Sequence, residues 1–405
     1  MAEPSQVDVW IGLDVGKGEH FADVLDHDGE RLFARAVIND QADLMALLER
    51  AARPGTPGLV IDQPGSIAQL ALAVAARRGV PVAYVPGLVM RRAADLYPGE
   101  AKTDRRDAYV LADTGRTRRR QVHWLEAGSD ELPAQLRVLN GSGIDLAADA
   151  TRLASRLRDA LTSISPALER AVGPRLHQPG ARALLMMYPT LTALRAASQS
   201  RIEHTVAARS PRIAARARTA IAAALAAQDV TVPAEAATGR VISELAGELD
   251  RVCARRDALA GEIEAVFLAH PGGELLATMP GIGPRTGARI LAEIGDGSAF
   301  TTGSKLAAYA GLAPVARQSG TSLNAATRSQ RGNHRLKNAM FLAAFASLRD
   351  PASKAFYDRK RTEGKRHNAA LICLARRHCD VILAMLRTQQ PYQPARPTPE
   401  LASAA

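Results

Sequence analysis

The sequence predicts an N-terminal α/β domain followed by two mainly helical domains, an α/β plus α fold class. The first sign is a set of short, valine-rich runs separated by turn residues within residues 1–125. The second is a long apolar stripe at helical spacing within residues 126–268. The third is a series of helical segments punctuated by Gly and Pro in residues 269–390. A chain of 405 residues has room for several domains, and the tail, residues 391–405, is predicted to be disordered.

The N-terminal region alternates strand and helix signals. Its predicted elements are, in order, the strand VDVWIGLDV, the hairpin HFADVL–DHDGE–RLFARAVI, a helix over 41–52, the strand GLVID, the helix SIAQLALAVAARRG and the strand PVAYV. Strands that first form a hairpin and then alternate with helices are typical of a mixed sheet covered by helices.

The middle region carries a heptad-like stripe near its end. Its members are Ile242, Leu245, Leu249, Val252, Leu259, Ile263 and Val266. Spacings of three, four and seven favour a coiled coil, with a helix over 136–161 as its antiparallel partner within the chain or in another subunit. An ordinary helical bundle explains the same stripe. The intervening alanine-rich run RIAARARTAIAAALAAQ is predicted to be helical but indicates no function.

The C-terminal region contains the run LLATMPGIGPRTGARILAEIGD, which predicts a helix, a tight turn and a second helix. Gly281, Gly283 and Pro284 form the turn, and Arg285 follows it. Backbone amides beside a helix N-terminus bind phosphate readily. The run is similar to a helix-hairpin-helix, a non-specific grip on the DNA backbone. A plain interhelical turn is the alternative.

Charge and cysteine content restrict the class of protein. The formal net charge is +11 with a pI near 10, which favours a polyanionic partner, first nucleic acid and then an anionic membrane. A general bias toward alanine and arginine explains the same charge. The three cysteines form no CxxC pair, so neither a disulfide framework nor a zinc ribbon is indicated. With no apolar run of transmembrane length, the expectation is a cytoplasmic protein without membrane contact.

Four aspartates form the most informative constellation. Asp14 and Asp62 each end a predicted strand, and Asp104 and Asp107 lie one helical turn apart in AKTDRRDAYVLAD. Carboxylates gathered from separate segments repel each other unless a divalent cation compensates them, and oxygen ligands favour Mg²⁺, with Mn²⁺ as an alternative. Such ions polarise phosphodiesters. Taken singly, an Asp at a strand end is usually a cap or a surface residue, and TDRRDA also fits a helix start with Thr103 or Asp104 as the N-cap.

The order of these acids is that of ribonuclease-H-like nuclease folds, and the chain resembles one family over nearly its whole length. The shared motifs are IGLDVGK, VID, KTDRRDA, MPGIGPRTG, AAYAGLAPVARQSG and RGNHRLKNAM. They resemble, in order, those of the DEDD transposases of the insertion-sequence family numbered one-ten, to which pilin-gene invertases are similar. The resemblance implies a RuvC-like domain, a coiled coil and a transposase domain with a nucleophilic serine.

The resemblance also assigns residues by position. Asp14, Asp62, Asp104 and Asp107 match the acidic tetrad, although the family commonly has Glu where this chain has Asp62. Ser319 in GLAPVARQSGTS matches the nucleophile. Ser322 and Ser329 are nearby serines that the match does not select. From the residues alone, Ser-Gly indicates a turn.

Basic residues around these motifs are candidate nucleic-acid contacts. The set, with the turn glycines, is Lys102, Arg105, Arg106, Gly281, Gly283, Arg285, Arg317, Arg328, Arg331, His334, Arg335 and Lys337. Those near Ser319 either neutralise the reacting phosphate or bind the DNA backbone. Two further runs, RTRRR at 116–120 and DRKRTEGKRH at 358–367, are tracks for nucleic acid or solvated surface.

The sequence therefore predicts a DNA transposase that excises and inserts its own element by Mg²⁺-dependent strand exchange through a phosphoserine intermediate. The resemblance implies as partners the element ends and target DNA, a structured non-coding bridge RNA, and further copies of the chain in a tetramer, in a bacterial, nucleoid-associated setting. Two alternatives stay open: a metal nuclease on branched DNA with Ser319 structural, and a non-catalytic nucleic-acid-binding remnant.

Overall fold

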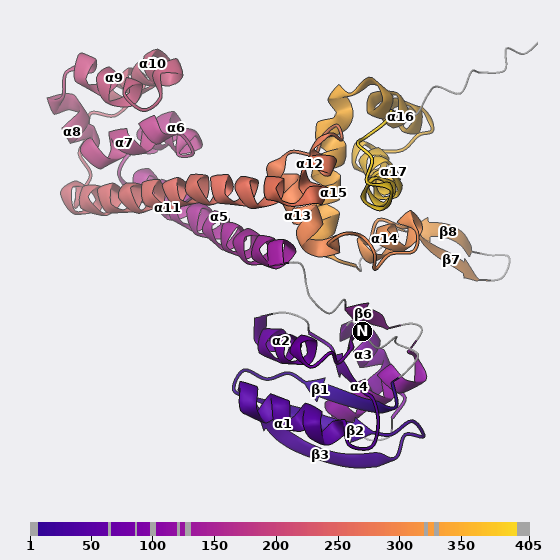
Figure 1. The fold of residues 1–405 in the computed structure, drawn as a ribbon. Coiled ribbons are helices and arrows are strands. Elements are labelled where there is room, and N and C mark those ends of the chain that lie inside the picture. Colours follow the sequence, from indigo (N-terminus) through magenta and orange to yellow (C-terminus); the bar gives the residue numbers. More distant parts are fainter. Residues whose placement is uncertain are drawn as a thin grey trace, which may run out of the picture. The chain divides into compact units, whose positions relative to one another are not determined.

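The computed structural model describes residues 7–63, 66–85, 87–97, 103–119, 122–125, 131–319, 323–327 and 332–394. The chain divides into two compact units, shown in Figure 1. The N-terminal unit comprises residues 1–133 and 297–301, and the C-terminal unit comprises residues 134–296 and 302–405.

A mixed six-stranded sheet forms the centre of the N-terminal unit. Its strands are β1 (Val9–Asp14), β2 (Glu19–Leu25), β3 (Arg31–Ile38), β4 (Pro57–Ile61), β5 (Val82–Tyr84) and β6 (His123–Leu125). They lie in the order β3-β2-β1-β4-β5-β6. The hairpin strands β1, β2 and β3 pair antiparallel, whereas β4 pairs parallel with both β1 and β5. This arrangement confirms the predicted mixed sheet. Strand β6 adds an unpredicted antiparallel edge to β5.

Helices cover both faces of this sheet. They are α1 (Gln41–Ala51), the 3-10 turn η2 (Ser66–Ala68), α2 (Gln69–Arg77), α3 (Gly87–Ala94) and α4 (Asp104–Thr117). Alternate residues of β1 face opposite sides of the sheet. Ile11 and Leu13 pack with α1 and α2 in one core, whereas Trp10 packs with α3 and α4 in the other. The same alternation places Leu59 on the first side and Val60 on the second.

Helix α4 lies unusually close to β1. A Cβ atom on Gly12 would stand 1.9 Å from the carbonyl oxygen of Ala108 and 2.5 Å from the backbone nitrogen of Ala112. Further along, a Cβ on Gly115 would stand 2.5 Å from Val60 and 3.0 Å from Trp10. Only glycine permits this backbone contact. Because Gly115 of α4 meets Trp10 and Ala108 meets Gly12, α4 runs antiparallel to β1.

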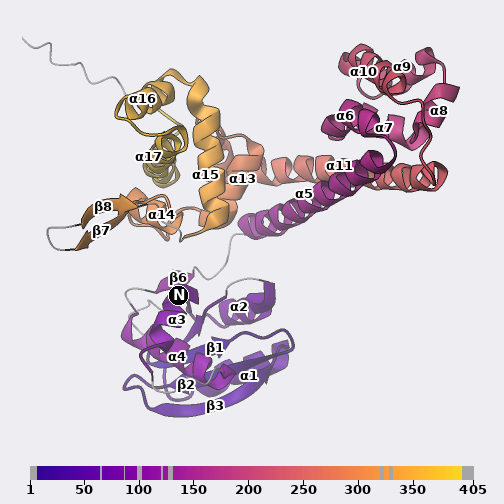
Figure 2. The same ribbon diagram turned by 180° about the vertical axis from the view of Figure 1, so that it is seen from behind.

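Two long helices, α5 (Glu131–Ile164) and α11 (Glu235–Ala269), begin the C-terminal unit. They lie side by side in Figures 1 and 2. A Cβ atom built on Gly143 of α5 would stand 3.6 Å from Leu259 of α11. Further along, Leu153 of α5 and Val252 of α11 line one groove. The two helices therefore run antiparallel. The predicted partner helix therefore lies within the same chain. The coiled-coil packing itself stays a prediction.

A small helical bundle is inserted between α5 and α11. Its elements are α6 (Pro166–Val172), η3 (Gly173–Arg175), α7 (Pro179–Met187), α8 (Leu191–Ala196), α9 (Gln199–Ala207), η4 (Pro211–Ile213) and α10 (Ala214–Ala227). Ile242, Leu245 and Leu249 of α11 are buried in its core. The first part of the heptad-like stripe thus serves an ordinary bundle.

The rest of the unit is helical apart from one hairpin. Its elements are α12 (Pro271–Ala277), α13 (Pro284–Ile294), α14 (Gly303–Tyr309), β7 (Val315–Ser319), β8 (Leu323–Thr327), α15 (His334–Ala346), η5 (Ser347–Arg349), α16 (Pro351–Thr362) and α17 (His367–Thr388). Helix α17 packs against α14, α15 and α16 (Figure 2). The β7–β8 hairpin was not predicted. Of the predicted disordered tail, residues 395–405 lie outside the described part. No described helix is long and apolar enough to cross a membrane.

The Gly12 contact gives a stability prediction. Gly12→Ala places a methyl group against the α4 backbone, so the N-terminal unit should lose about 1–3 kcal/mol or more of unfolding free energy. Both tryptophans, Trp10 and Trp124, lie in this unit. Urea unfolding followed by tryptophan fluorescence therefore reports on it selectively.

Gly18→Ala is the matched control, because nothing lies within 4 Å of a Cβ at that position. Equal urea midpoints for the two variants would contradict the close packing of α4 on β1.

Candidate functional site

Asp14 and Asp62 lie beside each other at one end of the sheet. Asp14 ends β1 and Asp62 follows β4, and these parallel strands pair up to Leu13 and Ile61. Each aspartate is therefore next in the register. Because alternate residues of a strand share a face, both aspartates lie on the face of the sheet that carries Trp10, Gly12 and Val60, which α4 covers. Both aspartates are half-buried.

The first turn of α4 lies toward the same end. Thr103 is the N-cap, and its Oγ1 accepts a hydrogen bond from the backbone nitrogen of Arg106 at 3.2 Å. This settles the predicted choice of cap in favour of Thr103 and leaves the Asp104 and Asp107 carboxylates uninvolved in capping. Since α4 runs antiparallel to β1, its N-terminal turn follows β1 toward Asp14. Asp104 is exposed and Asp107 half-buried.

Asp62 and Asp107 line one pocket of about 780 Å³. Arg91 and Asp95 from α3 and its C-terminus line it too, together with Arg106 of α4. The pocket thus contains three carboxylates and two guanidinium groups. Sequence reasoning missed α3, Arg91 and Asp95, which lie in the run GLVMRRAADLY; its amphipathic spacing was a usable signal.

The donor chemistry of this region suits a hard divalent cation, because it consists of carboxylate oxygens from three chain segments. As the side chains stand, however, no three acidic, His or Cys residues within the described parts of the chain are grouped closely enough to hold a metal ion. The type of ligand and the chain segments that carry it therefore suit a divalent cation. Of the four predicted ligands, Asp62 and Asp107 line the same pocket.

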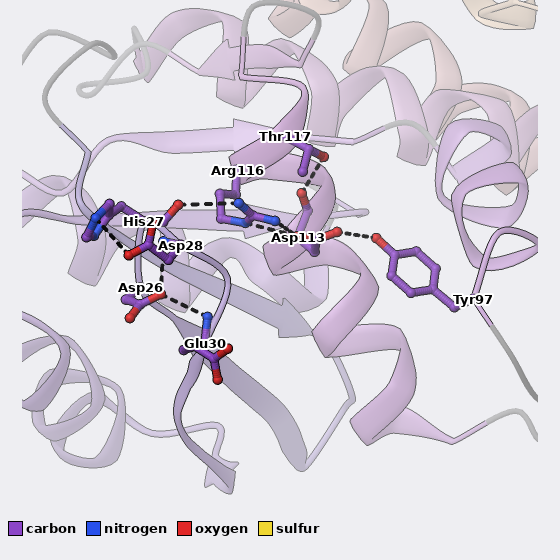
Figure 3. Close-up of polar contacts among 8 residues, drawn as sticks. All are labelled: Asp26, His27, Asp28, Glu30, Tyr97, Asp113, Arg116 and Thr117. Carbon is purple, nitrogen blue, oxygen red and sulfur yellow. Dashed lines mark hydrogen bonds and ion pairs between the residues drawn. The ribbon is translucent and has the colours of Figure 1, made fainter.

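Polar contacts fix α3 and α4 to each other around this pocket. The guanidinium group of Arg106 donates from Nη2 to the carbonyl oxygens of Ala94 at 3.1 Å and Tyr97 at 2.9 Å. The hydroxyl of Tyr97 donates to Oδ2 of Asp113 on α4 (Figure 3). Burial raises the pKa of the Tyr97 hydroxyl, and the Asp113 carboxylate raises it further, so Tyr97 stays a hydrogen-bond donor.

The same network reaches the hairpin between β2 and β3. Oδ1 of Asp113 accepts from Nη2 of Arg116 at 2.6 Å and from its Nε at 2.9 Å. Arg116 also donates to the carbonyl oxygen of His27 at 3.3 Å (Figure 3). Within the run at 116–120, Arg116 thus has a structural partner, whereas Arg118 and Arg119 are exposed.

An ion pair between a buried carboxylate and an exposed guanidinium contacts α4 through Tyr109. Asp23 on β2 has no exposed surface, and Nη2 of Arg31 approaches its Oδ2 at 2.8 Å. Burial raises the pKa of the Asp23 carboxyl, and the hydrogen bonds from Arg31 oppose that shift. The Arg31 guanidinium lies 5.1 Å from the ring centre of Tyr109 on α4. Exposed Arg105 is close enough to Asp23 to lower its pKa as well.

The predicted helix-turn-helix of the C-terminal unit is formed by α12 and α13. Gly281 has φ +86°, and a Cβ there would stand 2.2 Å from the carbonyl oxygen of Ala343 on α15. Packing against α15 thus explains this glycine. Gly283 is the N-cap of α13, no side chain caps that helix, and Gly283 and Arg285 are exposed. A DNA-binding role for the turn stays a prediction.

Helix α15 begins inside the motif RGNHRLKNAM. The Asn333 side chain caps it by accepting from the Leu336 nitrogen at 3.0 Å, and it donates to Glu293 at 2.5 Å. His334 and Arg335 are exposed, whereas Lys337 is only 8% exposed.

Ser319 is the last residue of β7 and pairs with Leu323 of β8 in an antiparallel hairpin. The structure gives its backbone position and that of Arg317. The side chains of both, with Gly320, Ser322, Ser329, Lys102, Arg328 and Arg331, lie outside the described residues. The hairpin explains why Ser319 stands at a chain reversal.

Two sequence profiles match the chain on either side of the inserted bundle. One, described as "Transposase" and built on the DEDD transposases of IS110, covers residues 11–166 and so includes all four aspartates. The second, "Transposase IS116/IS110/IS902 family", covers residues 273–358 and includes Ser319. Fold and motifs together thus define a transposase.

Relatives match over almost the full length. The "Insertion element IS110 uncharacterized 43.6 kDa protein" of Streptomyces coelicolor is 44% identical over 98% of each chain. The "Insertion element IS900 uncharacterized 42 kDa protein" of Mycobacterium paratuberculosis is 38% identical over 98% of this chain and 99% of its own. The "Pilin gene-inverting protein" of Moraxella bovis is 38% identical over 29% of this chain and 38% of its own. The chain belongs to the IS110 family of transposases.

The Tyr97 hydrogen bond gives a prediction for the acidic site. Tyr97→Phe removes the donor to the Asp113 carboxylate, so the unfolding free energy of the N-terminal unit should fall by about 1.5–3 kcal/mol. Urea unfolding followed by tryptophan fluorescence measures this loss.

Tyr109→Phe serves as the control, because its hydroxyl makes no hydrogen bond within the described residues and its ring contact with Arg31 is retained. A Tyr97→Phe variant as stable as Tyr109→Phe would show that the network does not hold α3 to α4.

Proposed function

We propose that this transposase excises and inserts its own element by strand exchange through a covalent phosphoserine intermediate, with RNA supplying target choice. The observation that carries the proposal is the location of Asp14, Asp62 and the first turn of α4 at one end of the sheet. The full-length similarity to insertion-element proteins supports it.

The acidic site is proposed to bind the divalent ion. Asp14, Asp62, Asp104 and Asp107 would hold Mg²⁺, or Mn²⁺ in its place. When bound, the ion supplies Lewis-acid polarisation of the scissile phosphodiester. The shorter reach of Asp62, compared with the Glu common in the family, is offset if the backbone of this strand end shifts slightly. The RuvC-like assignment of residues 1–125 fits this role.

The serine step is proposed to conserve the phosphodiester bond. The Ser319 hydroxyl loses its proton as Oγ forms a bond to phosphorus, and the bond from phosphorus to one DNA sugar oxygen breaks. That oxygen leaves as a hydroxyl group after taking up a proton. Attack by the hydroxyl of another strand then reverses the step and frees the serine, so no ATP is required. Arg317, Arg328 and Arg331 would stabilise the charge on the phosphate.

The serine and the acidic site are proposed to work together in a tetramer, with the acidic domain of one subunit beside the serine domain of another. Residues 126–268 would form the helical and coiled-coil connection, and residues 269–390 the transposase domain. Exposed Arg105, Arg285 and Arg335 are proposed to bind DNA phosphates. Arg106 already donates to two carbonyl oxygens of the chain, which suits a positioning role.

A structured non-coding RNA is proposed to supply sequence specificity. The protein itself has a net charge of +11, which supports sequence-independent binding to phosphates. Pairing between guide RNA and DNA would then select the site, as in other RNA-guided systems.

The metal site predicts a graded series at Asp62. Asp62→Ala should abolish DNA strand cleavage in Mg²⁺ because a ligand is lost. Asp62→Glu should retain cleavage because it restores the residue common in the family. Asp95→Asn is the matched control, since Asp95 lines the same pocket but is not a proposed ligand. Cleavage of end-labelled element-junction DNA measures all three.

Full cleavage by Asp62→Ala would remove Asp62 from the ligand set. Loss of cleavage with Asp95→Asn as well as Asp62→Ala would indicate a general effect of pocket charge.

The covalent step predicts a protein–DNA adduct that depends on Ser319. Denaturing electrophoresis of the protein with labelled junction DNA, guide RNA and Mg²⁺ should show a slow-migrating band for the native chain. Ser319→Ala should abolish that band and recombination together, because it removes the proposed nucleophilic hydroxyl. Ser322→Ala, a nearby serine, should leave the band unchanged.

An adduct that survives Ser319→Ala would move the nucleophile elsewhere. Cleavage without any adduct in the native chain would favour a metal nuclease in which Ser319 is structural.

RNA guidance predicts weak sequence preference in the RNA-free protein. Purified protein should bind unrelated DNA duplexes with similar affinity, and the affinity should fall steeply with salt because phosphate contacts dominate. Adding the guide RNA should create a preference for the matching site. Binding titrations at several salt concentrations measure both. Strong site preference without RNA at physiological salt would contradict the proposal.

A further inference from the structure

Three aromatic rings meet on the surface of the C-terminal unit, where α15, α16 and α17 pack together. The His367 ring stands 6.3 Å from the ring centre of Phe345 and 5.7 Å from that of Tyr357, edge to face in both cases. The Tyr357 hydroxyl and Nδ1 of His367 are hydrogen-bonded at 2.7 Å. We call Phe345, Tyr357 and His367 the aromatic platform.

The platform is open to solvent on part of its surface. The Phe345 side chain is 54% exposed, and Leu342, one turn earlier on α15, is 41% exposed. His367 is exposed and Tyr357 half-buried. Large apolar rings normally bury most of their surface, so an exposed aromatic cluster held in place by ring contacts and a hydrogen bond marks an interaction site.

The segment that carries Tyr357 and His367 is rich in basic residues, which we call the basic rim. Residues 354–367 contain six Lys or Arg and two acidic residues, a net formal charge of +4 with His neutral. Lys354 pairs with Asp358 at 2.5 Å, and Lys360 pairs with Glu363 at 2.8 Å. The remaining basic residues have no acidic partner within ion-pair distance among the described residues. These four are Arg359, Arg361, Lys365 and Arg366, and all are exposed.

A further aromatic ring, that of Phe356, contacts basic side chains of α16 and α17. Arg359 lies 5.1 Å, Arg377 5.2 Å and Lys360 5.7 Å from the ring centre of Phe356. The Arg377 contact joins α17 to α16, whereas the Arg359 and Lys360 contacts lie within α16. Arg359 and Lys360 are therefore held against a ring.

We infer that the aromatic platform binds an unpaired base of DNA, while the basic rim binds the flanking phosphates. Aromatic faces beside cations are the recurring means of binding single-stranded nucleic acid, because every base offers a π-face. In a duplex the base faces are already stacked on each other. The platform therefore selects unpaired DNA, which strand exchange must expose.

The inference rests on the transposase function and does not depend on RNA guidance, on Ser319 or on the metal site. An acidic protein partner would use the rim but gain little from ring faces, and charge complementarity alone would suffice for it. The combination of rings and cations favours the nucleotide.

The test is a binding titration of the full-length protein in EDTA, without guide RNA. The probes are a fluorescent 20-nucleotide DNA strand, the same strand as a duplex, and an RNA of the same sequence. Phe345→Ala should weaken binding to the single strand about tenfold, the effect of losing one stacked base. Binding to the duplex should change by less than about twofold. EDTA separates this outcome from failure of the metal or serine chemistry.

Leu342→Ala is the matched control, because it removes an exposed apolar side chain from the same helix face but no ring. It should bind the single strand like the native chain. Phe345→Leu keeps apolar bulk and should still lose the single-strand affinity, which guards against a folding artefact of Phe345→Ala. Thermal unfolding of each variant confirms that it is folded.

Three results would overturn the inference. Unchanged single-strand binding in both Phe345 variants would show that the ring is not used. Equal loss for single strand and duplex would show phosphate binding alone. A loss confined to the RNA probe would assign the platform to RNA instead of DNA.

Discussion

The approach of α4 to β1 at Gly12 is the contact on which the acidic site depends. A single methyl group there would meet the carbonyl oxygen of Ala108 at 1.9 Å. Interiors packed at this density cannot absorb such a shift locally. Because α4 packs directly against the backbone of β1 and runs antiparallel to it, the first turn of α4 lies toward the strand end that carries Asp14. Asp62 joins it there through the parallel pairing of β4 with β1.

Polar and aromatic contacts around α4 hold it in this position on the sheet. Arg31 and Asp23 hold α4 through Tyr109, and Asp113, one turn further along α4, holds Tyr97 and Arg116 (Figure 3). An ion pair such as Asp23–Arg31, whose carboxylate is buried, is weak evidence for net stability, since desolvation of that carboxylate offsets much of the attraction. Its value here is positional: breaking it leaves a buried charge, so α4 has one favoured place on the sheet.

Local patterns were enough to predict most of the N-terminal sheet and the helical character of the rest. Strands β1 and β2 are buried on both faces over most of their length, so they are largely apolar runs rich in β-branched and aromatic residues, which is a strand signal. Strands β4 and β5 are as short as β6, β7 and β8, but their runs GLVID and PVAYV are continuous apolar segments and could be predicted. Strand β6 and hairpin β7–β8 escaped prediction because HWL, VARQS and LNAAT contain no such apolar run. Asp62 and Asp107 could be selected by their motifs, but Arg91, Asp95 and Tyr97 enter the pocket only through the packing of α3, which is a tertiary fact. The turn that contains Gly281 likewise suggested phosphate binding from the sequence. In the structure, Gly281 packs against the backbone of α15.

The central claim is that three chain segments meet at one metal ion, and iron-mediated cleavage tests it directly. Fe²⁺ bound in place of Mg²⁺, with ascorbate and peroxide, generates hydroxyl radicals that cut nearby backbone. The account predicts cuts near Asp14, near Asp62 and within 103–108, all suppressed by excess Mg²⁺ and all absent from Asp14→Ala. Cuts in one segment alone, or cuts that Mg²⁺ does not suppress, would contradict the convergence of these segments on a single ion.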